Sequence, residues 1–209
     1  MRVFFASVKN IFTFTREDKI IFVLAVALQL GALGVLIALS RVYDFSFPII
    51  GSDSRLHIMG MQSLLTYHRF IDLRTFTPLS FILPGYSFFL AIVISLTGTI
   101  WAVPLMQILL AGISAVLLFH IGAFLHPLAG WVAALLFIMD PAGLYYTNVV
   151  LTEPLFLPLA IAAWFVLISF PHHALQKSLV AGLLMGATIL VRPAGIILLP
   201  GALVFLLTS

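Results

Sequence analysis

The chain has 209 residues, no cysteine and few charged side chains. Without cysteine it can form neither a disulfide nor a catalytic thiolate. Only 8% of its residues are Asp, Glu, Lys or Arg, whereas a soluble domain carries about 25%. The sequence has no basic run, and its aromatic residues lie in apolar stretches, so we expect no nucleic-acid partner.

Apolar residues dominate instead, at 63% of the chain. The first long apolar segment covers residues 20–39, and Gln29 is its only strongly polar residue. A helix of about 20 residues, rising about 1.5 Å per residue, crosses a hydrocarbon core of roughly 30 Å. The sequence therefore predicts an all-α, polytopic integral membrane helical bundle.

The residues before this segment indicate its orientation. Residues 1–19 mix aromatic with basic side chains, which predicts an interfacial helix, with a disordered lead-in as the alternative. The basic residues place the N-terminus in the cytoplasm, and the apolar segment is too long for a cleaved signal peptide. Residues after 41 then emerge on the outer face, among them the polar stretch GSDSRLHIMG at 51–60.

Further apolar segments follow, and the first of them leaves two topologies open. The segments are 79–97, 101–122, 128–147, 154–170, 178–191 and 194–208. Pro84 interrupts 79–97, which either spans the membrane or lies on its outer surface as a bent helix. If it spans, Glu153 faces the cytoplasm. If it lies on the surface, Glu153 shares a face with Asp53, and Lys177 is cytoplasmic, as the positive-inside rule prefers.

Four motifs resemble the GT-C membrane glycosyltransferases. They are GSDSRLHIMGMQSLL, LPGYSFFLA, NVVLTEPLF and AGLLMGATILVRPAGIILLP, in this order along the chain. The closest resemblance is to the family 39 or protein-mannosyltransferase-like group, which includes aminoarabinose transferases. It covers residues 20–209 and implies a GT-C-like transmembrane domain. An outer catalytic loop over about 41–100 would carry juxtamembrane helices between the first two spans.

The resemblance also implies roles for individual residues. Asp53 would be the catalytic base, and Glu153 a second acid that orients the acceptor or binds a divalent cation together with Asp53. Arg192 would bind the lipid phosphate, and Arg55 and His57 are further candidates for this contact. No other metal site or cofactor is expected.

Each of these residues also has a purely structural interpretation. Asp53 could cap a helix beginning at Ser54, and Glu153 could stabilise a helix N-terminus by its charge. Arg192, next to Pro193, could extend to the membrane interface. A charged group at a break in a membrane helix is more often functional.

The expected function is transfer of a sugar from a polyprenyl-phosphate-linked donor to a lipid, glycan or protein acceptor. Transfer would be inverting and take place at the outer face of the cell membrane. A multispan transporter is an alternative, although no inverted repeat is visible. A non-catalytic membrane assembly subunit is another. The chain stops inside an apolar segment, so a C-terminal truncation is expected.

Overall fold

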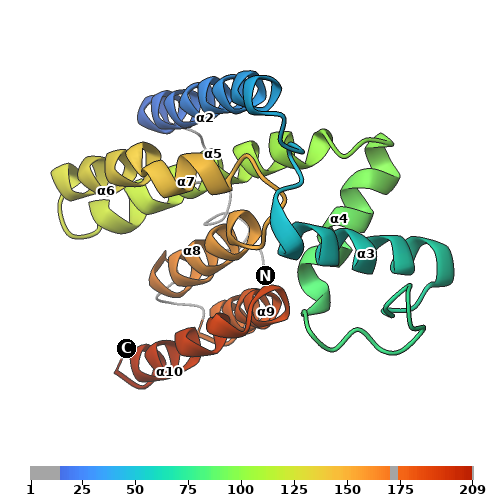
Figure 1. The fold of residues 1–209 in the computed structure, drawn as a ribbon. Helices are drawn as coiled ribbons and strands as arrows, with labels where there is room; N and C mark the ends of the chain where they lie inside the picture. The colour runs from blue at the N-terminus through green and yellow to red at the C-terminus, as the bar shows by residue number, and fades with distance from the viewer. Residues whose placement is uncertain (1–14, 170–173, 209) are drawn as a thin grey trace.

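A computed structural model of the chain describes residues 15–169 and 174–208. These residues form a helical bundle and contain no β-strand, only an isolated bridge between Ile71 and Pro78 (Figure 1). The predicted all-α membrane bundle is thus confirmed. The helices are α2 (Arg16–Tyr43), α3 (Gly51–Tyr67), α4 (Pro84–Thr97), α5 (Ala102–Ala123), α6 (Pro127–Met139), α7 (Pro141–Tyr146), α8 (Glu153–Ser169), α9 (Ala174–Val191), the 3-10 helix η1 (Pro193–Ile197) and α10 (Leu198–Thr208).

Among the described helices, α2 and α5 are long and apolar enough to cross a membrane. Helix α2 begins with a capping box, in which Thr15 and Asp18 each bond the other's backbone N–H. Arg16 and Lys19 therefore belong to the start of α2. The rest of the interfacial segment expected over 1–19 lies outside the described residues.

Helix α4 begins at Pro84 instead of being interrupted there. Pro84 occupies the first turn, where a proline costs nothing because that N–H has no partner in the helix. The 14 residues of α4 cover about 21 Å, less than a hydrocarbon core of roughly 30 Å. The segment expected over 79–97 is thus a shorter helix, and it packs mainly along α3.

The apolar segment expected over 128–147 consists of two helices, α6 and α7. Helix α6 ends at Met139, because Pro141 cannot continue it. The side chain of Asp140 accepts hydrogen bonds from the N–H groups of Ala142 and Gly143 at the start of α7. Asp140 thus ends α6 and caps α7.

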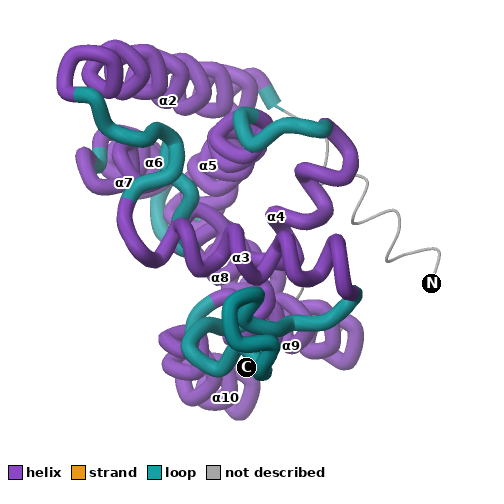
Figure 2. Tube along the Cα trace, turned by 45° about the vertical axis from the view of Figure 1, so that its right-hand side comes forward, coloured by secondary structure: helices purple, strands orange, loops and turns teal. Residues whose placement is uncertain are grey.

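Three apolar clusters hold the helices together. One joins α2, α5 and α6 through residues such as Ile21 and Ala115, and another joins α8, α9 and α10 through residues such as Leu167 and Met185. The third joins α3, α4, α5, α8 and α9 around Tyr86 and Leu90. In Figure 2, α3 lies between the group containing α2 and α7 and the group containing α9 and α10.

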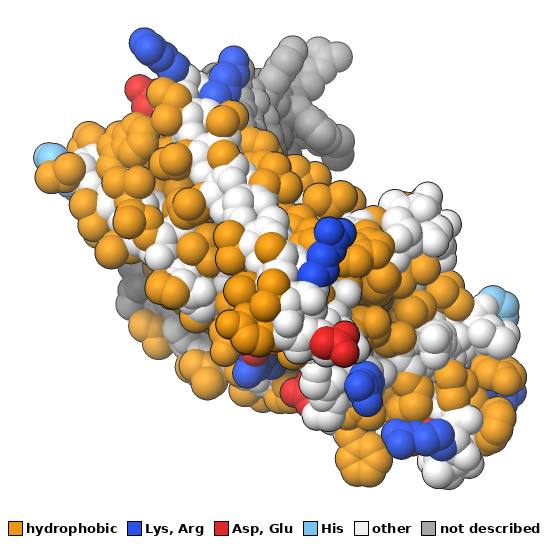
Figure 3. Space-filling model, turned by 45° about the horizontal axis from the view of Figure 1, so that its top comes forward, with side chains coloured by type: hydrophobic (Ala, Val, Ile, Leu, Met, Phe, Trp, Pro, Cys, Tyr) orange, Lys and Arg blue, Asp and Glu red, His pale blue; other side chains and the backbone are white. Residues whose placement is uncertain are grey.

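The surface of the bundle fits a lipid environment. Large apolar side chains are exposed along α2 and α5, including Val23, Val35 and Leu105. Figure 3 shows charged side chains at the upper left of one face and again from its centre to its lower right, with mainly hydrophobic side chains between the two groups. A bilayer requires this distribution, because charged groups are costly in the hydrocarbon core.

Candidate functional site

A pocket of about 320 Å³ lies where four separate segments of the chain meet. Residues 53 and 57 come from α3, residues 80–83 from the loop before α4, residues 151–153 from the start of α8, and residues 191–193 from the break after α9. Four of the five residues expected from the sequence to be functional line this one pocket: Asp53, His57, Glu153 and Arg192. The polar side chains thus come from positions up to 139 residues apart (192 − 53).

Arg192 and Glu153 form an ion pair across the pocket. Nη1 of Arg192 donates to Oε1 of Glu153 at 2.5 Å. Glu153 is the first residue of α8, where the helix N-terminus favours a negative charge. Arg192 follows the last residue of α9 in an extended conformation, as Pro193 requires of the residue before it. Both side chains remain partly exposed, so a ligand can reach them.

Asp53 lies in the first turn of α3, and it is not the helix cap. Helix α3 begins at Gly51, whose positive φ of 80° suits glycine, and not at Ser54 as the capping interpretation expected. The backbone N-cap position is Ile50, which makes no side-chain cap hydrogen bond. The Asp53 side chain is exposed and accepts a hydrogen bond from Ser52 Oγ. Its carboxylate is therefore available to a substrate.

His57 lies one helical turn after Asp53 and is almost completely buried, with 5% exposure. Its ring packs edge-on against Tyr86, and its Nδ1 has no hydrogen-bond partner. Burial lowers the pKa of His57 below the ordinary value of 6.5, although the negative charges of Asp53 and Glu153 partly oppose this. The ring is therefore neutral at pH 7, and it can contact a phosphate only through a hydrogen bond.

Arg55 is not brought to the pocket. It is exposed, and in a helix it lies about 200° around the axis from Asp53, while His57 returns close to the same face. The structure thus groups Asp53, His57, Glu153 and Arg192 and leaves Arg55 apart.

The residues that support the pocket had no role in the sequence-based prediction. The irregular segment 147–152, which leads into Glu153, is bonded by two glutamines, Gln29 and Gln107, from otherwise apolar parts of α2 and α5. A lone amide side chain within an apolar helix was the signal that could have indicated them, because such a group must find a partner.

A divalent cation has a limited donor set in this pocket. Within residues 15–169 and 174–208, no group of three or more His, Asp or Glu side chains could hold a metal ion. Asp53 and Glu153 could supply two carboxylates, but Glu153 is already neutralised by Arg192. A cation there would have to displace the guanidinium or share the carboxylate with it.

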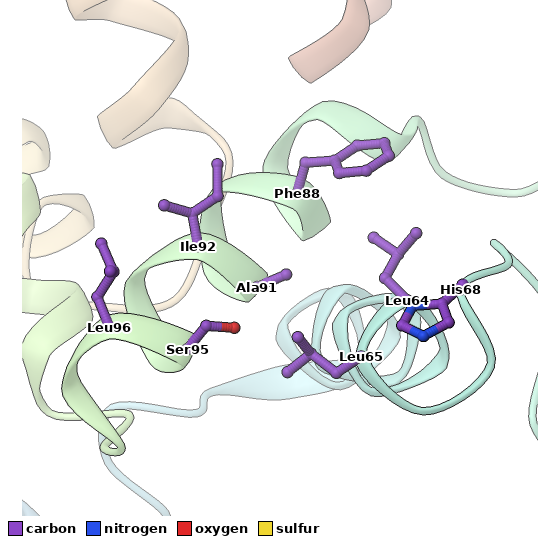
Figure 4. A pocket seen from close by; sticks show the side chains of 8 residues that line it. All are labelled: Leu64, Leu65, His68, Phe88, Ala91, Ile92, Ser95 and Leu96. Atoms are coloured by element: carbon purple, nitrogen blue, oxygen red, sulfur yellow. The ribbon is translucent and has the colours of Figure 1, made fainter.

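A second pocket, of about 550 Å³, lies between α3 and α4 and is apolar (Figure 4). It is lined by Leu64 and Leu65 of α3, by His68 directly after this helix, and by residues of α4 that include Phe88, Ile92 and Leu96. It contains no carboxylate, and His68 is its only ionisable side chain. Of these two pockets, only the first is lined by carboxylates.

Comparison with known protein families gives a match over the larger, C-terminal part of the chain. The model of a family described as dolichyl-phosphate-mannose-protein mannosyltransferase matches residues 78–209. The matched region includes Glu153 and Arg192, whereas Asp53 and His57 precede it. No curated protein and no solved structure shows a significant match to the chain.

Proposed function

The chain belongs to the dolichyl-phosphate-mannose-protein mannosyltransferase family, and on this basis we propose that the pocket between α3, α8 and α9 transfers a sugar from a polyprenyl-phosphate-linked donor to an acceptor hydroxyl. The family supports a glycosyltransferase activity in an integral membrane protein. Inverting transfer at the outer face, with Asp53 as the base, is the finer proposal.

The observation that carries the proposal is the meeting of Asp53, Glu153 and Arg192 in one pocket. Transfer of a glycosyl group from a phosphate needs a group that removes the acceptor proton and a cation that stabilises the departing phosphate. The pocket offers both, from segments that only the fold brings together.

In the proposed step the acceptor oxygen attacks the anomeric carbon of the sugar. The new carbon–oxygen bond forms as the bond to the phosphate oxygen breaks, and the configuration inverts. The proton of the acceptor hydroxyl passes to the carboxylate of Asp53. The electron pair of the broken bond stays on the lipid phosphate, whose negative charge is stabilised by the guanidinium of Arg192.

Glu153 contributes in two ways. It holds Arg192 in place through their ion pair, and its second carboxylate oxygen can accept a hydrogen bond from the acceptor. His57, neutral and lining the same pocket, is suited to a hydrogen bond with the sugar or the phosphate. Arg55 lies on the other side of α3, where it could contact a lipid headgroup outside the pocket.

The test is the substitution Asp53→Asn in the membrane-embedded protein. Asparagine keeps the shape of the side chain but cannot take up a proton at neutral pH, so transfer from a radiolabelled lipid-linked sugar should fall by a factor of at least about 100. The matched control is Asp44→Asn, an exposed acid that follows α2 and does not line the pocket. It should transfer sugar at the normal rate. Near-normal transfer by Asp53→Asn would refute its role as the base.

A further inference from the structure

The segment 147–152, between the end of α7 and the start of α8, is not helical. The carbonyl group of Thr152 accepts hydrogen bonds from Leu155 and Phe156 of α8, but the carbonyl groups before it lie outside any helix. Irregular backbone is tolerated in a membrane protein only where other protein groups satisfy it. Because Glu153 follows this segment directly, whatever holds the segment also determines where the Glu153 carboxylate lies.

Gln107 supplies the central contacts. It lies within the apolar helix α5 and has no exposed surface. Its Nε2 donates one hydrogen bond to the carbonyl oxygen of Thr147 at 2.8 Å and another to that of Val149 at 2.9 Å. One side chain thus holds two of the carbonyl groups that lead to Glu153.

Tyr86 bonds the other end of this amide. Its hydroxyl donates to Oε1 of Gln107 at 2.6 Å. Carbonyl oxygens only accept hydrogen bonds, so the NH₂ group of Gln107 must face Thr147 and Val149 while its oxygen faces Tyr86. Tyr86 belongs to α4 and is itself fully buried. The amide is therefore fixed from both ends, without an alternative orientation.

Contacts from other elements complete the attachment of the segment. Ser54 Oγ donates to the carbonyl oxygen of Val150, and the N–H of Val150 donates to the carbonyl oxygen of Pro48. Asn148 Nδ2 donates to Oε1 of Gln29. These contacts tie the segment to α2, to α3 and to the connection between them, while Gln107 ties it to α5 and, through Tyr86, to α4.

From this geometry we infer that Gln107 is a positioning residue for the transfer reaction. It holds the segment 147–152 so that the Glu153 carboxylate meets Arg192 in the pocket. The inference rests on the proposed function, because it concerns the position of Glu153 in that reaction. Gln107 itself does not line the pocket, so we assign it no direct contact with the substrate.

The test begins with Gln107→Met. Methionine is unbranched and of similar length, so it fills the space but removes both side-chain donors. The carbonyl group of Thr147 then loses its bond to Gln107, and that of Val149 keeps only the N–H of Leu151. Movement of Glu153 by about 1 Å should lower kcat by a factor of up to about 100. The matched control is Ser114→Ala, a buried polar residue of α5 that bonds only within its own helix, to Leu110. It should leave kcat unchanged.

A double-mutant cycle with Glu153→Gln separates positioning from general support of the fold. If Gln107 acts through Glu153, Gln107→Met should cost no more than about twofold once Glu153→Gln is present. An equal loss in both backgrounds, or no loss in either, would overturn the inference. If Glu153→Gln alone transfers sugar normally, the proposed role of Glu153 fails first, and the inference fails with it.

Tyr86→Phe provides a second variant should Gln107→Met not accumulate in the membrane. It removes the hydroxyl that bonds Oε1 of Gln107 and that also contacts the backbone of Leu151, and it leaves both carbonyl contacts of Gln107 possible. We expect a loss of kcat of about fivefold, which should also disappear in the Glu153→Gln background. A loss that persists in that background would argue against positioning.

Discussion

At the residue scale, the proposed reaction requires Arg192 to bind two anions at once, the carboxylate of Glu153 and the phosphate of the donor lipid. In the structure its Nη1 donates to Glu153. A guanidinium has five N–H donors, so the remaining donors can bind a phosphate while the contact with Glu153 persists. A lysine has a single ammonium group and would have to divide it between the two anions. The two basic residues are therefore not equivalent at this position.

We expect Arg192→Ala to lower kcat/KM for the lipid-linked donor by about 100-fold and Arg192→Lys by about tenfold. Hydrogen bonds to charged groups contribute about 1.5–3 kcal/mol, and about 1.4 kcal/mol corresponds to a factor of ten. The measurement is initial transfer rate against donor concentration in membranes of known composition. Arg69→Ala, an exposed arginine outside the pocket, is the control. Equal donor kinetics in all variants would make Arg192 only an interfacial anchor.

Part of the site could be predicted from single residues. Arg192 before Pro193 indicated a break after an apolar helix, and the structure has that break. The ion pair with Glu153 could not be predicted, because its partners are 39 residues apart and no local pattern relates them. His57 lines the pocket and Arg55 does not, because the two side chains lie on different faces of α3. The sequence did not show which face of this helix meets the pocket. The start of the helix was also misplaced, since it begins at Gly51, earlier than expected.

At the scale of elements, the close approach of α4 to α9 determines where Arg192 lies. A Cβ atom on Gly85 would come within 2.6 Å of the backbone carbonyl of Leu190, and 2.8 Å from the N atom of Val191. Gly85 is near the start of α4, and Leu190 and Val191 end α9 directly before Arg192. A side chain larger than hydrogen at position 85 would therefore displace the end of α9 and the pocket residues attached to it.

Gly85→Ala should destabilise the protein by about 1–3 kcal/mol and lower the transfer rate. Gly186→Ala, on α9 itself, is the matched control, because a Cβ there meets no atom within 4 Å. Alanine is the better helix former, so Gly186→Ala should be neutral or slightly stabilising. Thermal unfolding in detergent and transfer in membranes would measure both effects. A Gly85→Ala protein of unchanged stability and rate would show that the two helices can separate without consequence.

Prolines account for both the correct and the incorrect predictions of helix boundaries. The break before Pro193 was predicted, because a residue preceding proline leaves the helical conformation. The role of Pro84 was misjudged, since a proline in the first turn begins a helix as readily as one in the interior interrupts it. Pro141 divided a segment that apolar composition alone had made continuous.

At the scale of the whole molecule, the site depends on which helices are neighbours. Apolar composition predicted that the segments pack together, but it contains no information on partners, because almost every face of these helices is apolar. Buried polar contacts such as that between Gln29 and Asn148 specify one arrangement, since a polar group without its partner is costly in the bundle. These pairs are distant in sequence, and a single sequence does not relate them.

The orientation of the bundle in the membrane is the last prediction. Asp53, Glu153 and Arg192 share one pocket, so they must face the same side. Ser52 and Ala194 are exposed beside this pocket. Two other exposed residues are Leu125, in the connection that follows α5, and Gln176, near the start of α9. Gln176 thus lies at the opposite end of α9 from Arg192.

Because the chain has no cysteine of its own, single cysteines at these four positions report orientation without background. If the pocket faces outward, an impermeant thiol reagent added to intact cells should label Ser52→Cys and Ala194→Cys. It should label Leu125→Cys and Gln176→Cys only after the membrane is opened. The reverse pattern would place the pocket in the cytoplasm and contradict transfer at the outer face. Labelling of Ser52→Cys and Ala194→Cys from opposite sides would contradict the shared pocket itself, and with it the joint action of Asp53 and Arg192 on one substrate.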